Sequence, residues 1–241
     1  RRLAYRASAP THSPLTYVWL SGFKSDMSGT KVTELEAWAT EAGHGFLAFD
    51  YSGHGLSDGA FEDGTISAWR EDALAAIDTH STGPIVLVGS SMGGWMALLA
   101  ALARPDRVAG LVLIAPAPDF TEKLMWPEFS AEAQSEIMEQ GFTQRPSDYD
   151  EPYTITRALI EDGQTWQILD APIKLDIPVR ILQGMQDADV PWKHAERLVD
   201  TITSEDLIFT LIKDGDHRLS REQDIARLKT TCAEIATATR P

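Results

Sequence analysis

Short apolar runs alternate with amphipathic segments along most of the chain. The apolar runs, which predict strands buried on both faces of a sheet, occupy residues 15–20, 46–49, 84–88, 108–114, 179–182 and 207–212. The segments with apolar side chains at helical spacing, which predict amphipathic helices, occupy residues 33–41, 66–80, 95–104, 192–200 and 223–238. A short first strand is expected at residues 3–6. This alternation predicts an α/β fold with a mostly parallel central sheet and helices on both faces.

One stretch interrupts the alternation of strands and helices. Between residues 119 and 173, helical patches at residues 131–140 and 154–161 are separated by a polar break at residues 145–153, and no apolar strand is convincing. Such an interruption after a strand indicates an inserted segment. Because α/β folds of this length often form one unit, we expect a single domain over residues 1–241 with a small helical cap at residues 119–173.

Composition and charge narrow the classes of function. With 43% hydrophobic and 24% charged residues, the chain has the composition of a folded globular protein. A formal net charge of −15 opposes binding to nucleic-acid phosphates or anionic lipid surfaces. We find no apolar run long enough to span a membrane and no signal peptide after Arg1. Cys232, the only cysteine, excludes an intrachain disulfide and fits a reducing compartment, so we expect a cytoplasmic protein.

A candidate nucleophile follows the apolar run at residues 84–88. The segment Gly89-Ser90-Ser91-Met92-Gly93 matches the pattern G-x-S-x-G and stands just before the predicted helix. A tight turn from strand to helix needs small residues at its two glycine positions and presents the central hydroxyl above the sheet. In this context the motif predicts a nucleophilic Ser91 rather than a simple Gly/Ser-rich turn.

A serine nucleophile needs a base and a third group that orients the base. Of the six histidines, His217 follows the last predicted strand in a loop long enough to reach the motif; we expect the others to be structural or solvated. Asp187 and Asp189, in the loop after residues 179–182, compete for the third position, and Asp189 is also placed to cap the next helix. Asp50 precedes the motif, and we expect it to brace its own glycine-rich loop. The order Ser, Asp, His is the one used with this type of elbow.

Acyl transfer also requires donors for the oxyanion that forms on the substrate, and rigid backbone N–H groups serve this purpose. The N–H of Met92, next to the nucleophile, is one expected donor. The second is expected from Phe23 in the Ser21-Gly22-Phe23 loop after residues 15–20, although Gly22 could simply end that strand. Nothing resembles a cofactor or metal site, so we expect neither.

Together these motifs resemble the α/β-hydrolase superfamily of serine hydrolases from residue 17 to the last helix. The glycine-rich stretch at residues 50–57, residues 184–191 and Asp216-His217-Arg218 carry the resemblance along with the serine motif. Several of these segments look like the branch that contains a mitochondrial acyl-protein thioesterase, which also cleaves acyl glucuronides, and its bacterial relatives. Many members have His-Gly where this chain has Ser21-Gly22.

The resemblance implies a role for each candidate residue. It implies Ser91 as nucleophile, His217 as base, Asp187 as the acid that orients the base, and the N–H groups of Met92 and Phe23 as oxyanion hole. The expected activity is hydrolysis of a carboxylic ester or thioester, with a small-molecule ester or thioester as substrate and an acyl-enzyme as intermediate.

Alternatives of a different class stay open. The chain could be a hydrolase-like protein that binds a small ligand without catalysis, or a peptidase that uses the same triad. Apolar residues between residues 119 and 173 either line an acyl pocket or pack the cap, so the acyl length is not predicted. Lys24 and Arg218 either favour a carboxylate-bearing substrate or are solvated charges. The sequence does not predict the oligomeric state.

Overall fold

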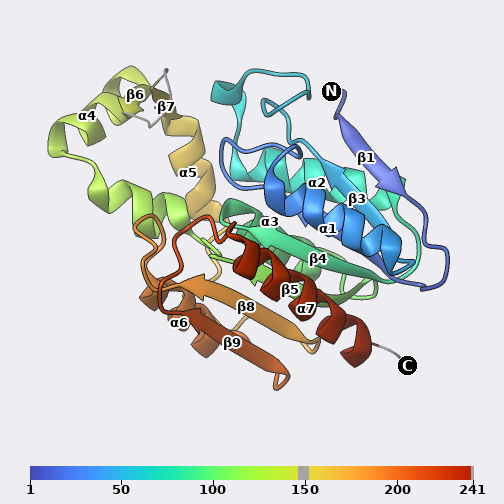
Figure 1. The fold of residues 1–241 in the computed structure, drawn as a ribbon. Helices are drawn as coiled ribbons and strands as arrows, with labels where there is room; N and C mark the ends of the chain where they lie inside the picture. The colour runs from blue at the N-terminus through green and yellow to red at the C-terminus, as the bar shows by residue number, and fades with distance from the viewer. Residues whose placement is uncertain (146–151, 240–241) are drawn as a thin grey trace.

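A seven-stranded sheet forms the centre of the computed structural model, which describes residues 1–145 and 152–239 (Figure 1). The strand order is β1-β3-β2-β4-β5-β8-β9. In chain order the strands are β1 Tyr5–Ser8, β2 Thr16–Leu20, β3 Gly45–Phe49, β4 Ile85–Ser90, β5 Val108–Ile114, β8 Val179–Gly184 and β9 Leu207–Ile212. Only β1 pairs antiparallel to its neighbour in this sheet; the other described pairs are parallel. The mostly parallel sheet predicted from the sequence is confirmed.

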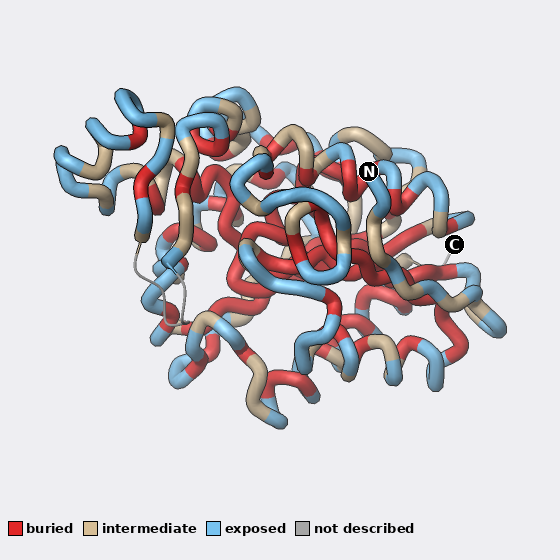
Figure 2. Tube along the Cα trace, turned by 90° about the horizontal axis from the view of Figure 1, so that it is seen from above, coloured by how far each residue is buried: buried red, intermediate tan, exposed pale blue. Residues whose placement is uncertain are grey.

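Helices cover both faces of the sheet. They are α1 Thr30–Glu41 and α7 Glu222–Ala238 on one face, and α2 Ile66–His80, α3 Met92–Ala103 and α6 Trp192–Thr201 on the other. Successive side chains of a strand point to opposite faces, so Val88 of β4 packs with α1 and α7 while Leu87 packs with α2 and α3. The sheet is therefore buried on both sides, as the red centre of Figure 2 shows. In the described ranges no helix is long and apolar enough to cross a membrane.

Between β5 and β8 the chain leaves the sheet and forms a segment that lies at one end of the molecule (Figure 1). In order it contains a π-helical turn Thr121–Met125, a 3-10 turn Trp126–Glu128, α4 Ala131–Gln140, β6 Phe142–Arg145, β7 Tyr153–Thr156 and α5 Arg157–Thr165. We call residues 119–173 the insert. The strands β6 and β7 form an antiparallel hairpin.

The hairpin corrects two sequence predictions about the insert, namely that it is helical without strands and that a helix spans residues 154–161. Residues 153–156 are strand, and α5 begins only after Thr156, whose side chain accepts a hydrogen bond from the N–H of Leu159. Thr143 and Ile155 face each other across the hairpin and are buried, which gives these short aromatic and β-branched segments a reason to pair. The predicted polar break falls largely on residues 146–151, outside the described residues.

Asp119 ties the start of the insert to its end. Its buried carboxylate accepts hydrogen bonds from the N–H groups of Ile168 (2.9 Å) and Leu169 (3.0 Å). The residue adopts φ 56°, a conformation that costs a non-glycine residue about 1–3 kcal/mol and persists only where surroundings enforce it. Burial raises the pKa of the Asp119 carboxyl. Asp119 thus holds the start and the end of the insert together where they leave the sheet.

The turn between β4 and α3 has no room for side chains at its two glycines. A Cβ on Gly93 would stand 1.9 Å from the carbonyl oxygen of Leu20, and a Cβ on Gly89 would stand 2.3 Å from that of Gly93. Both contacts involve backbone atoms, which cannot rotate away. The steric role expected for these glycines is confirmed.

Gly93→Ala is expected to destabilise the fold by at least about 1–3 kcal/mol, the usual cost of overpacking a filled site. Urea unfolding followed by tryptophan fluorescence measures this. The matched control is Gly29→Ala, because a Cβ at Gly29 meets nothing within 4 Å; Gly29 precedes α1, and we expect a change below about 1 kcal/mol there. Equal stability of the two variants would contradict the steric account of the turn.

Candidate active site

Ser91 lies in the turn between β4 and α3 with a strained backbone. Its φ of 56° and ψ of −119° are rare for a residue with a side chain and typical of a nucleophile elbow. Its N–H donates to the carbonyl of Ile114 (2.9 Å), and its carbonyl accepts from the N–H groups of Gly94 (2.9 Å) and Ala117 (3.1 Å). These hydrogen bonds to β5 and α3 hold the strained turn. Ser91 itself is only partly buried.

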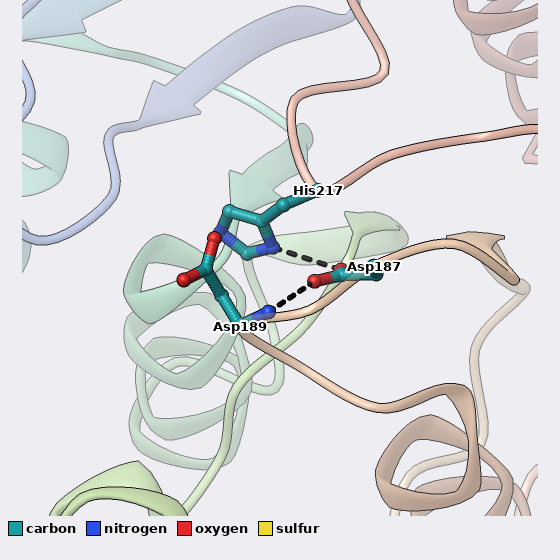
Figure 3. Close-up of side chains that lie close together, drawn as sticks. All are labelled: Asp187, Asp189 and His217. Atoms are coloured by element: carbon teal, nitrogen blue, oxygen red, sulfur yellow. Dashed lines mark hydrogen bonds and ion pairs between the residues drawn. The ribbon is translucent and has the colours of Figure 1, made fainter. Parts of the chain in front are cut away.

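The loops after β8 and β9 bring Asp187 and His217 together (Figure 3). The Nδ1 atom of His217 lies 2.8 Å from Oδ2 of Asp187. The Asp187 side chain is 0% exposed and that of His217 is 24% exposed. The other oxygen, Oδ1, accepts hydrogen bonds from the N–H groups of Asp189 (2.9 Å) and Val190 (2.8 Å). A carboxylate held at both oxygens suits an ionised acceptor that fixes the imidazole tautomer, leaving Nε2 of His217 free to act as base.

The two competing aspartates differ in their contacts with His217. Asp187 meets His217, whereas Asp189 is exposed and does not cap α6, whose N-cap is Pro191 without a side-chain hydrogen bond. The expectation that Asp189 caps the helix is wrong, because the loop turns at Asp187 and directs the Asp189 backbone N–H back to it. An oxygen of Asp189 still lies within 4.8 Å of a His217 nitrogen and an Asp187 oxygen. Among the described residues, these three form the group of histidine and carboxylate side chains close enough together to hold a metal ion.

Ser91, Asp187 and His217 lie after β4, β8 and β9, at the same edge of the sheet, where parallel strands present their carboxyl ends. In the described structure, no hydrogen bond joins Ser91 to His217. Hydrogen bonds of this kind often tighten only when substrate is bound. The three candidate residues thus lie at one edge of the sheet, and the hydrogen bond present among them joins Asp187 and His217.

The loop that carries His217 is fixed by contacts on both sides. The N–H of Gln186 donates to the carbonyl of Gly215 at 2.8 Å, which links the loops after β8 and β9. On the other side, the ammonium of Lys31 on α1 donates to the carbonyl of Arg218. Burial lowers the pKa of Lys31 to about 8. The loop that carries His217 is therefore held on one side by the loop after β8 and on the other side by α1.

The two expected oxyanion donors lie next to the elbow, and neither has an acceptor among the described residues. Met92 is the first residue of α3, a position whose N–H has no acceptor within its own helix. Within the described ranges, the N–H of Phe23 has no acceptor either. The loop of Phe23 touches the elbow, since a Cβ on Gly22 would lie 3.3 Å from both the Ser90 carbonyl oxygen and Ser91 Cβ. This arrangement fits an oxyanion hole.

The glycine-rich loop after β3 supports the Phe23 loop. Asp50 accepts hydrogen bonds from the N–H groups of Met27 (2.8 Å) and Leu56 (2.9 Å), so its predicted bracing role is confirmed and extends to a second loop. His54, which we expected to be merely structural or solvated, accepts the N–H of Lys24 at Nε2 (3.2 Å). Burial lowers the pKa of His54, which favours the neutral ring that such an acceptor requires. No sequence motif signalled this contact.

His54→Leu is expected to lower kcat by roughly 10- to 100-fold with a smaller change in KM, because the residue after Phe23 loses its acceptor and small displacements of catalytic groups are costly. Steady-state kinetics on p-nitrophenyl butyrate measures the split. His12→Leu removes an exposed imidazole elsewhere and should leave kcat unchanged. If the His54 variant kept the wild-type kcat, the proposal that His54 supports the Phe23 loop would be contradicted.

The Lys24 side chain is not simply solvated. Although the residue is exposed, its ammonium lies 4.6 Å from the ring centroid of Phe61 and 5.0 Å from that of Tyr153. Phe23 packs edge-on against the same two rings, at 4.9 Å and 6.3 Å. Lys24 and Phe23 thus connect the candidate oxyanion loop to β7 of the insert.

Several aromatic and apolar residues of the insert act in packing. The indole N–H of Trp166 donates to the hydroxyl of Ser67 on α2 (2.7 Å), and Ile137 is fully buried. Met138 and Phe142 are 43% and 46% exposed. A pocket of about 240 Å³ lies near Trp166, between α2 and the carboxyl-terminal part of α3. It lies at the opposite end of α3 from Ser91, so it is not the candidate active site.

Comparisons with known proteins agree with the fold of this chain. The sequence pattern of the alpha/beta hydrolase family matches residues 17–229. The chain is 38% identical over 220 residues to palmitoyl-protein thioesterase ABHD10, mitochondrial, from Bos taurus, and 37% identical to the Homo sapiens protein of that name. Each alignment covers 90% of this chain and 72% of the relative.

Solved structures show the same similarity. A protein from Agrobacterium vitis S4 that is named as a hydrolase superposes with a TM-score of 0.94 at 45% identity, covering 97% of this chain and 93% of the other. Alpha/beta hydrolase domain-containing protein 10 from mouse superposes with a TM-score of 0.88 at 36% identity, with the same coverage of 97% and 93%.

Proposed function

We propose that this chain, which belongs to the alpha/beta hydrolase family, uses Ser91, His217 and Asp187 as a catalytic triad. The observation that carries the proposal is the 2.8 Å contact between Nδ1 of His217 and the buried Oδ2 of Asp187, at the same sheet edge as the strained turn of Ser91. Its relatives show that the chain is an ester or thioester hydrolase. What we add is the assignment of each step to these residues.

In the first half of the proposed reaction, Ser91 Oγ attacks the acyl carbonyl carbon while Nε2 of His217 takes the hydroxyl proton. The resulting imidazolium is stabilised by the Asp187 carboxylate. The N–H groups of Met92 and Phe23 donate to the oxyanion of the tetrahedral intermediate, where the loss of one such donor costs about 3 kcal/mol. Collapse breaks the bond to the alcohol or thiol, which leaves with the proton from His217. Water, activated by the same base, then hydrolyses the acyl-enzyme on Ser91.

For the substrate, we propose a thioester that joins a long acyl chain to a cysteine. The names of the curated relatives, palmitoyl-protein thioesterases, support this choice. We further propose that the insert, residues 119–173, is a cap over the reacting groups. Aromatic contacts of Phe23 with Tyr153 of β7 support a cap that touches the oxyanion loop. A cytoplasmic location stays a prediction, since those relatives are named as mitochondrial proteins.

A comparison of peptide substrates tests the proposed thioester. We expect kcat/KM for an S-palmitoyl cysteinyl peptide to exceed that for its S-acetyl counterpart by tenfold or more, since each buried methylene adds about 0.8 kcal/mol. The released thiol is measured with a chromogenic disulfide. A preference for the acetyl peptide would overturn the long-chain assignment. If the protein cleaves neither thioester but does turn over p-nitrophenyl esters, it is a hydrolase of oxygen esters and the thioester assignment is wrong. Absence of all turnover would favour the alternative of a ligand-binding protein.

A further inference from the structure

Gln183, near the end of β8, lies directly behind the candidate acid. Its side-chain amide is fully buried, and Nε2 lies 3.0 Å from Oδ2 of Asp187. The same nitrogen lies 3.0 Å from the carbonyl oxygen of Val190 and 3.2 Å from that of Gly184. The Asp187 oxygen that receives Nδ1–H of His217 therefore receives a second donor from inside the domain.

The surroundings fix which end of the Gln183 amide faces Asp187. Three oxygen acceptors converge on one position, and two of them are backbone carbonyls that can only accept. Turning the amide over would place Oε1 against all three acceptors. Oε1 is a buried atom without a hydrogen-bond partner in the described structure, and such an orphan costs about 1–3 kcal/mol. The arrangement that directs the N–H donor to Asp187 therefore leaves Oε1 of Gln183 unpaired.

We propose that Gln183 is a positioning residue for hydrolysis: it holds Oδ2 of Asp187 as an ionised, correctly aimed acceptor for His217. The proposal rests on the triad proposed above. A buried carboxylate with fewer donors binds a proton more readily, and Oδ2 loses one of the contacts that fix its direction toward the imidazole. A missing donor therefore acts on the acid and base together, which should appear in the pH dependence of catalysis rather than in substrate binding.

Two nearly isosteric variants test this role. Gln183→Met removes the donor, and we expect kcat to fall by about tenfold or more, KM to change little, and the acid limb of the kcat/KM profile to move to higher pH. Gln183→Glu places a carboxyl against three acceptors. When ionised it adds a negative charge beside Asp187, so we expect a larger shift of the acid limb, by about one pH unit or more.

Gln186 offers the matched control, because it lies three residues further along, in the loop after β8, and its exposed side chain donates to the carbonyl of Lys213 and not to Asp187. Both substitutions keep the backbone N–H that Gln186 donates to Gly215. Gln186→Met and Gln186→Glu should keep the wild-type acid limb and kcat. Circular dichroism shows which variants are folded, and only those are compared. If both Gln183 variants fold and keep the wild-type acid limb, or shift it no more than the Gln186 variants do, the positioning role is overturned.

Failure of the underlying triad gives a different result. If Asp187→Asn keeps wild-type kcat, the triad itself is wrong, and the role of Gln183 falls with it. If Asp187→Asn loses activity while Gln183→Met and Gln183→Glu behave as wild type, only the positioning role is contradicted. Loss of kcat with a shifted acid limb in the Gln183 variants alone, and not in the Gln186 variants, supports it.

Discussion

Replacement of Ser91 with alanine is expected to lower kcat on p-nitrophenyl butyrate by roughly 10⁴-fold or more, to a rate near that of the other triad knockouts. The reason is that the acyl-enzyme cannot form without Oγ. Folding should change little, because the hydroxyl makes no hydrogen bond in the described structure and the strained backbone is held by main-chain contacts with Ile114, Gly94 and Ala117. Initial rates measured over several enzyme concentrations give the comparison.

Ser90→Ala is the matched control for this experiment. It removes the same hydroxyl one position earlier, at the end of β4, from a residue that is 8% exposed. Because successive strand side chains point in opposite directions, we expect kcat within a few-fold of wild type. If Ser90→Ala abolished turnover while Ser91→Ala retained it, the assignment of the nucleophile would be wrong.

Asp187→Asn is expected to lower kcat by roughly 10³–10⁴-fold with little change in the fold. An asparagine can turn its NH₂ group toward His217. Nδ1 must then accept, which places the proton on Nε2, and the ring can no longer take the serine proton. Steady-state kinetics between pH 5 and pH 9 measures the loss of kcat.

Asp189→Asn tests the same chemical change two residues further along the loop. Asp189 is exposed. Its hydrogen bond to the triad comes from its backbone N–H, which the substitution keeps, and its carboxylate lies near His217 without a hydrogen bond in the described structure. Surface charges contribute about 0–1 kcal/mol, so we expect at most a few-fold change. If Asp189→Asn lost more kcat than Asp187→Asn, then Asp189 and not Asp187 would be the acid that orients His217.

The strands of the sheet and the helices that cover it could be predicted because each has a sequence pattern that does not depend on the rest of the chain. The strand Val108–Ile114 and the helix Ile66–His80 begin and end where the sequence predicts, since burial on both faces and helical spacing are local properties. The elbow helix begins at Met92 rather than residue 95. Its first turn contains two glycines, which have weak helix propensity; the packing of Gly93 against Leu20 and of Gly94 against Pro116 explains their presence.

The hairpin of the insert could not be predicted in the same way. Its strands, Phe142–Arg145 and Tyr153–Thr156, are short, and in the described part of the chain they pair with each other. A short segment next to the helix Arg157–Thr165 reads as part of that helix when the partner strand is not considered. Pairing across a loop is tertiary information, and propensity gives way to it.

The candidate site divides along a similar line. Ser91 is marked by its motif, and His217 and Asp187 by their places after predicted strands. Gln183 and His54 carry no motif, because their roles depend on which acceptor or donor the folded chain brings to them: Asp187 Oδ2 for the first and the Lys24 N–H for the second. The resemblance implied Asp187 rather than Asp189, and the folded chain supplies a physical reason for that choice in the 2.8 Å contact with His217.

Mass spectrometry of a covalent adduct tests the central claim, that Ser91 forms the acyl-enzyme, most directly. The wild-type protein is incubated with an alkyl fluorophosphonate, digested and mapped by peptide sequencing, beside Ser90→Ala and Ser91→Ala. We predict one phosphonyl group per chain, located on Ser91 in wild type and in Ser90→Ala, and no adduct in Ser91→Ala. An adduct on another residue, or a wild type that turns over p-nitrophenyl butyrate without being labelled or inhibited, would contradict the account.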